Sequence, residues 1–141
     1  MKAKIEIINS SSFKLLPIKK VASLIAKVLE DFKFEEYSLN IIYFDNSQIQ
    51  ELNKKFLNHD YPTDVISFNI DDNPLIAEIY IGVEIAKLQA NEFKVSLRNE
   101  ILRLAVHGCL HICGYNDKTV DEKTIMSSLE DKYLEYARKN S

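Results

Sequence analysis

The chain has 141 residues, of which 46% are hydrophobic, and its 18 basic and 21 acidic residues give a net charge of -3. This length and composition predict a single domain, residues 1–141, with one hydrophobic core. The negative balance excludes the general cationic surface of non-specific nucleic-acid binders, so any RNA contact would need a local basic patch. No apolar run has signal-peptide or membrane-spanning length, so we expect a cytoplasmic protein without membrane contact.

The first half of the chain alternates strand and helix patterns. A strand is predicted over residues 2–8, where apolar and polar residues alternate. Residues 17–34 carry an apolar stripe at helical spacing, and Pro17 suits the first turn of that helix. Residues 37–44 are typical of a strand, and the polar segment 45–48 predicts the start of a second helix.

The second half begins with two short strands and ends with helices. The strands are predicted over residues 65–70 and 76–81, with a turn between them. Three helices follow: one over residues 83–93, one from an N-cap at Ser96 to a stop at Gly114, and one opened by a capping box at Thr119. These patterns predict an α+β (mixed α/β) fold with about four strands in a mixed sheet and about five helices.

The strongest chemical signal is the segment 106–117, VHGCLHICGYND. His107 and His111 are four residues apart, so both project from one face of the predicted helix and can share a metal ion. Gly114 allows a left-handed turn at the helix end, which would return Asp117 toward the two imidazoles. We predict that His107, His111 and Asp117 hold one divalent ion, interpreted as Zn²⁺, and that the open fourth position activates water for hydrolysis.

Position 108 separates this motif from those of the metalloproteases. The pattern H-x-x-x-H-x-x-G-x-x-D has the spacing of the metzincin site, with a carboxylate as third ligand. Metzincins place a glutamate general base directly after the first histidine, and this chain has Gly108 there. Peptide hydrolysis by that route is therefore disfavoured, and we interpret Gly108 as room beside the metal for a bulky phosphodiester. The sequence identifies no general base.

These residues resemble the signature of the YbeY family, bacterial endoribonucleases and rRNA maturation factors with the pattern H-G-x-L-H-x-x-G-Y-D-H. The matching positions are His107, Gly108, Leu110, His111, Gly114 and Tyr115. Looser matches are Leu52-Asn53 with Phe56, residues 62–68, and Met126 with Glu130. The resemblance implies a zinc-dependent nuclease of single-stranded RNA that matures the 3′ end of small-subunit rRNA and acts in ribosome quality control. Its candidate partners are rRNA and small-subunit ribosomal proteins.

Two positions depart from the family pattern. Asp117 stands in place of the third histidine, and its negative charge should make a bound water a weaker acid. Leu57 falls where the family usually has an arginine and cannot hold a phosphate. Lys54, Lys55 and His59 are candidate replacements for RNA contact, with a solvated helix face as the alternative for the lysines.

Thr63, Asp64 and Ser67 also match family positions near a strand start. They are candidate cleft residues, although each has an equally plain turn or capping role. Glu78 is either a site residue or a surface carboxylate of an edge strand.

Three further features near the histidines have alternative interpretations. Glu100 and Arg103 precede His107 by seven and four residues, so they either orient an imidazole or, as we favour, form a surface salt bridge. Met126 is interpreted as core in preference to a residue beneath the metal. Cys109 and Cys113 are interpreted as reduced, apolar packing residues.

The sequence therefore favours a metal-dependent endoribonuclease of single-stranded RNA. One alternative is another metallohydrolase, such as a peptidase, which the missing glutamate disfavours. The other is a metal-stabilised ribosome-assembly factor without catalytic activity, which the loss of the arginine at Leu57 favours.

Overall fold

The computed structural model describes residues 2–140, in which four strands and five helices follow one another. In chain order they are β1 (Ala3–Asn9), α1 (Lys19–Asp31), β2 (Tyr37–Phe44), α2 (Asn46–Leu57), β3 (Val65–Asp72), β4 (Leu75–Gly82), α3 (Val83–Phe93), α4 (Leu97–Ile112) and α5 (Val120–Lys139). The predicted α+β fold is thus confirmed.

The strands form one mixed sheet in the order β1-β2-β4-β3. β1 runs parallel to β2 and β2 parallel to β4, whereas β3 pairs antiparallel with β4 at the edge. The antiparallel pair needs only the short turn between Asp72 and Leu75, while the β1–β2 connection requires a crossover, which α1 supplies. β3 extends two residues beyond its predicted end at Ile70, and its pairing with β4 shifts register between Asn69 and Asp71.

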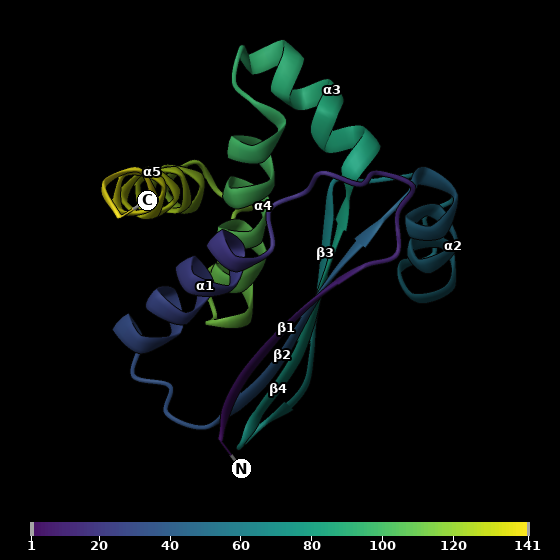
Figure 1. Cartoon of the computed structure of the whole chain (residues 1–141). Coiled ribbons are helices and arrows are strands. Elements are labelled where there is room, and N and C mark those ends of the chain that lie inside the picture. The colour runs from purple at the N-terminus through teal and green to yellow at the C-terminus, as the bar shows by residue number, and fades with distance from the viewer. Residues whose placement is uncertain (1, 141) are drawn as a thin grey trace.

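Helices cover the two faces of the sheet unequally. Figure 1 shows α1 and α4 on one side of the sheet, α5 outside α4, and α2 on the opposite side. α4 contacts α1, α3 and α5 as well as β3 and β4, so it is the central helix of the fold. Any residue of α4 therefore faces a different neighbour according to its position around the helix.

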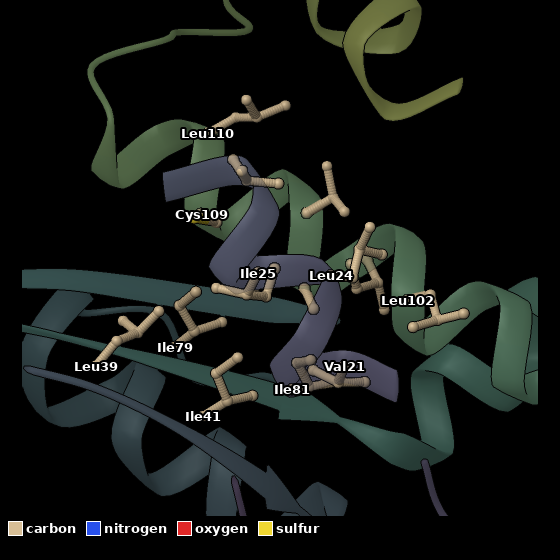
Figure 2. Packing of buried hydrophobic residues seen from close by; sticks show 14 of the residues in the cluster. Val21, Leu24, Ile25, Leu39, Ile41, Ile79, Ile81, Leu102, Cys109 and Leu110 are labelled. Carbon is tan, nitrogen blue, oxygen red and sulfur yellow. The ribbon is translucent and has the colours of Figure 1, made fainter. Parts of the chain in front are cut away.

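The core lies between the sheet and these helices. Alternate residues of β2 and β4 point toward α1, and the apolar stripe of α1 points back at them (Figure 2). Leu39, Ile41, Ile79 and Ile81 from the strands and Ile25 from α1 are fully buried. Burial of each such side chain stabilises the fold by roughly 1.5–3 kcal/mol.

The ends of α1 differ from the predicted ones. The helix begins at Lys19, so Pro17 lies before it, and the Pro17 carbonyl accepts a hydrogen bond from the Tyr43 hydroxyl. The helix ends before Phe34 because Lys33 adopts a left-handed φ of 68°. Within residues 2–140, no helix has the length and apolar character needed to cross a membrane.

Candidate metal centre

His107 and His111 lie one turn apart on α4, with Asp117 beside both. The two Nε2 atoms are 3.1 Å apart. Asp117 Oδ2 lies 3.3 Å from His107 Nε2, and Asp117 Oδ1 lies 3.5 Å from His111 Nε2. Tetrahedral ligands at zinc bond lengths of 2.0–2.1 Å stand about 3.3 Å from one another. The three side chains therefore fit the donor set and the spacing of one divalent ion, and they could hold it.

The end of α4 brings Asp117 back to the histidines. Gly114 adopts a positive φ of 105°, which side-chain-bearing residues rarely adopt. The amides of Gly114 and Tyr115 donate to the carbonyls of His111 and Leu110, both at 3.0 Å, so the last turn is closed by hydrogen bonds. The predicted left-handed turn is confirmed.

A glutamate from α5 contacts the first histidine from behind. Glu130 Oε2 lies 2.8 Å from His107 Nδ1, on the opposite edge of the ring from the Nε2 that faces Asp117. Glu130 is one of the looser family matches in the sequence, where no role is predicted for it. Glu130 is the one charged residue on the buried stripe of α5, and a buried carboxylate needs a partner. A glutamate within the apolar stripe of a helix is therefore the sequence feature that could have indicated a buried partner for Glu130.

Glu100 and Arg103 form an ion pair between α4 and α5, in which Glu100 is buried and Arg103 is partly buried. Arg103 Nε donates to Glu100 Oε1 at 2.9 Å, and Arg103 Nη1 donates to Glu130 Oε1 at 3.0 Å. Glu100 is 1% exposed, so the interpretation as a surface salt bridge was wrong. The physical reason is the position of α5, which covers this face of α4. Glu130 links Arg103 to His107 through hydrogen bonds.

The carboxylates around His107 change its protonation. Burial disfavours the imidazolium, but the hydrogen bond and charge of Glu130, with the charges of Asp117 and Asp64, outweigh it and raise the pKa of His107. The hydrogen bond to Glu100, together with Glu130, raises the pKa of Arg103 despite burial. A centre with this much negative charge favours a cation, either a proton or a metal ion.

Gly108 lies on a different face of α4, against the sheet. A Cβ there would stand 2.9 Å from Ile79 Cγ2 and 3.3 Å from Val65 Cγ2. The glycine allows α4 to approach β3 and β4 closely. Its interpretation as room for a phosphodiester was therefore wrong, because residue 108 points 100° around the helix from its neighbour His107.

Asp64 is the predicted cleft residue that the fold brings toward the histidines. Its charge contributes to the raised pKa of His107. Its Oδ1 accepts a hydrogen bond from the Val65 amide at 2.7 Å, and its Oδ2 accepts one from Gln89 Nε2 at 3.1 Å. Asp64 therefore holds the start of β3 and also contributes to the field at the centre.

Thr63 and Ser67 occupy positions set by the sheet. The Thr63 carbonyl stands 2.3 Å from where a Cβ of Gly82 would lie, so it packs against a bare backbone. Ser67 pairs opposite Ile79, on the sheet face that α4 covers. Glu78 accepts a hydrogen bond from the Tyr80 hydroxyl at 3.0 Å. It lies on β4, which is an interior strand, so its interpretation as an edge-strand residue was wrong.

Lys54, Lys55 and His59 lie on the surface at the end of α2 and in the following loop. Lys55 Nζ stands 5.4 Å from the centre of the Phe56 ring. The His59 ring stacks on Tyr61 at 5.3 Å and 12°. α2 and α4 cover opposite faces of the sheet (Figure 1). Their contact with RNA stays a prediction.

Two smaller predictions concern buried residues near the centre. Met126 is buried in the hydrophobic core, as predicted. Cys109 is buried and Cys113 is partly buried, and both are free thiols, also as predicted.

Comparison with known proteins matches the chain to one family. A family model described as endoribonuclease YbeY matches residues 6–138. The proteins named endoribonuclease YbeY from Chlorobium chlorochromatii and Acholeplasma laidlawii are 33% and 41% identical to this chain over 132 and 116 residues. These matches cover 93% and 81% of this chain and 84% of each relative.

A relative from a phytoplasma and a solved structure also match most of this chain. Endoribonuclease YbeY of Aster yellows witches'-broom phytoplasma is 40% identical over 139 residues, which cover 93% of this chain and 92% of the relative. The solution structure of TM1509 from Thermotoga maritima matches with a TM-score of 0.65 and 30% identity, covering 94% of this chain and 88% of that one.

Proposed function

The chain belongs to the endoribonuclease YbeY family, and from this premise we propose that it is a metal-dependent hydrolase of single-stranded RNA that acts in rRNA processing. Within that activity we assign it the 3′-end maturation of small-subunit rRNA and ribosome quality control in the cytoplasm. Its partners in the proposal are rRNA and proteins of the small ribosomal subunit.

The observation that carries the proposal is the triangle of donors formed by His107, His111 and Asp117. The two Nε2 atoms are 3.1 Å apart, and the Asp117 oxygens Oδ2 and Oδ1 lie 3.3 Å from His107 Nε2 and 3.5 Å from His111 Nε2. These separations suit one four-coordinate ion, for which we propose Zn²⁺. Three protein ligands leave one position for a reactant, as in catalytic zinc sites. When bound, the ion would lower the pKa of water and neutralise negative charge on a phosphodiester.

The residues of the centre remain accessible to a substrate. The side chains of His107, His111 and Asp117 are 18%, 29% and 38% exposed, so each side chain is partly buried and still reachable from solvent. His107 and His111 contribute neutral nitrogen donors, and Asp117 contributes one negative charge. These three ligands together offset less of the positive charge of the ion than three carboxylates would.

RNA contact away from the centre is assigned to the surface of α2. Lys54 and Lys55 supply positive charge for phosphates, and the stacked pair His59 and Tyr61 presents aromatic faces suited to bases. In this proposal they replace the arginine missing at Leu57. Replacement of Lys54, Lys55 and His59 by alanine should weaken RNA binding, and unchanged cleavage would remove them from the proposal.

The test of the proposed activity is cleavage of a short single-stranded RNA by purified protein. We expect cleavage that a chelator abolishes and added Zn²⁺ restores. His111→Ala, prepared in the same way, should be inactive, which excludes a contaminating nuclease. Equal activity in all preparations would contradict the proposal. Stoichiometric metal binding without cleavage would favour the non-catalytic assembly factor.

A further inference from the structure

Four polar side chains between α4 and α5 form a continuous row that ends on the first histidine of the centre. Glu100, Arg103 and His107 follow one another on α4 at intervals of three and four residues, so they share one face of the helix. Glu130 reaches this face from α5. Hydrogen-bond distances along the row are 2.9 Å between Glu100 and Arg103, 3.0 Å between Arg103 and Glu130, and 2.8 Å between Glu130 and His107.

Arg103 accounts for the burial of two carboxylates. Glu100 and Glu130 are both buried, which is costly for ionised groups without a partner. The guanidinium of Arg103 satisfies both, because it donates two hydrogen bonds to Glu100 and a third to Glu130. The fork of the guanidinium thereby sets the position of the Glu130 carboxylate. A lysine would carry the charge without this geometry.

The contact with Glu130 selects one tautomer of His107. A neutral imidazole carries a single proton, and an ionised carboxylate can only accept a hydrogen bond. Glu130 therefore requires the proton on Nδ1, which leaves Nε2 with its lone pair. Nε2 is the atom that lies 3.1 Å from His111 Nε2 and 3.3 Å from Asp117 Oδ2. One contact thus determines both the tautomer and the orientation of the ring.

We propose that Glu130 is a positioning residue that fixes His107 as a metal ligand, and that Arg103, anchored by Glu100, holds Glu130 in place. This inference rests on the proposed metal site but does not depend on the substrate. It assigns α5 a part in the centre although α5 supplies no ligand. Partners of this kind typically change metal affinity by about 10- to 100-fold.

The tautomer can be read in metal-free protein by ¹⁵N NMR of the histidine rings at a pH where imidazoles are neutral. We expect His107 in the Nδ1–H form in the wild type and a mixture of tautomers in Glu130→Gln, whose amide can donate as well as accept. Zn²⁺ affinity, measured by competition with a chelator, should fall about tenfold or more. Glu135→Gln is the matched control, because Glu135 lies on the same helix and pairs with Arg138 at the surface.

Wild-type His107 in the Nε2–H form would overturn the proposal without any variant. A folded Glu130→Gln protein with wild-type tautomer and wild-type Zn²⁺ affinity would also overturn it. If Glu130→Gln does not fold, the tautomer of His107 is measured in Arg103→Lys instead. We expect a mixture of tautomers in that variant, and the wild-type tautomer alone would contradict the proposal. A wild type that binds no Zn²⁺ would overturn the metal centre and this role together. A wild type that binds Zn²⁺ without cleaving RNA would overturn the activity alone.

Discussion

Gly108 on α4 and Ile79 on β4 approach each other so closely that a Cβ on the glycine would lie 2.9 Å from Ile79 Cγ2. Two opposing effects therefore act on Gly108→Ala. Alanine favours the helix by about 1 kcal/mol, whereas forcing a methyl group into a packed core costs about 1–3 kcal/mol. Ile79 is fully buried, and Val65 Cγ2 would stand 3.3 Å from the added methyl group, so we expect a net loss of about 1 kcal/mol.

Urea denaturation of metal-free protein measures this change, with Ser128→Ala as the control. Ser128 is an exposed residue inside α5, where alanine adds helix propensity without a clash. A Gly108→Ala protein as stable as the wild type, or more stable, would show that α4 does not need the glycine for its approach to the sheet.

Tight Zn²⁺ binding should require a good metal ligand at position 117, either the carboxylate of Asp117 or an imidazole. Asp117→Asn removes the anionic donor and should lower Zn²⁺ affinity on the order of 10-fold or more. Asp117→His restores the third imidazole of the family signature and should retain tight binding. Competition with a chromophoric chelator measures both, and Asp121→Asn, an exposed aspartate nearby in α5, should have wild-type affinity. Wild-type affinity in Asp117→Asn would mean that a different group is the third ligand.

Asp31 and Tyr133 should make a pH-dependent contribution to stability. Tyr133 Oη donates to Asp31 Oδ2 at 2.8 Å, and Lys27 Nζ lies 3.0 Å from Asp31 Oδ1. Although burial opposes ionisation, these two partners lower the pKa of Asp31. A carboxyl with a lowered folded-state pKa stabilises the protein above its unfolded pKa and loses this contribution as pH falls through the folded-state pKa.

Asp31→Asn should therefore be less stable than the wild type by about 1 kcal/mol near neutral pH, a modest value because the Asp31 side chain is 25% exposed. The difference should shrink in acid, below the ordinary aspartate pKa of about 3.9. Denaturation at several pH values measures it, with the exposed Asp131→Asn as the control. A difference that persists unchanged in acid would mean that the charge of Asp31 is not its source.

Cys113 should react before Cys109 in the folded, metal-free protein. The hydrogen bond between the two thiols lowers the pKa of Cys113. The same bond and complete burial raise the pKa of Cys109 well above its ordinary value. Since the thiolate is the reactive form, we expect alkylation of Cys113 to be faster by roughly tenfold or more. Mass spectrometry of the labelled peptides measures the rates, and denaturant should make them equal. Equal rates in the native protein would contradict this assignment.

The sequence by itself determined the candidate metal-binding motif and the element order, because both depend on local geometry. Four-residue spacing places His107 and His111 on one helix face, and the glycine at position 114 permits the turn that returns Asp117. Apolar periodicity likewise predicted the strands and helices within a few residues. The prediction differed from the structure by a few residues at helix ends, as at Pro17, because local patterns define helix ends less sharply than helix interiors.

Only the tertiary structure decided what surrounds the motif. Strand order depends on which strands pair, and local periodicity carries no information about pairing partners. The face of α4 that meets the sheet gave Gly108 a packing role, and the face that meets α5 buried Glu100 and joined His107 to Glu130, 23 residues further along the chain. A charged residue in a helix has the same local pattern whether water or another helix covers it, so the packing of α5 against α4 made these residues part of the centre.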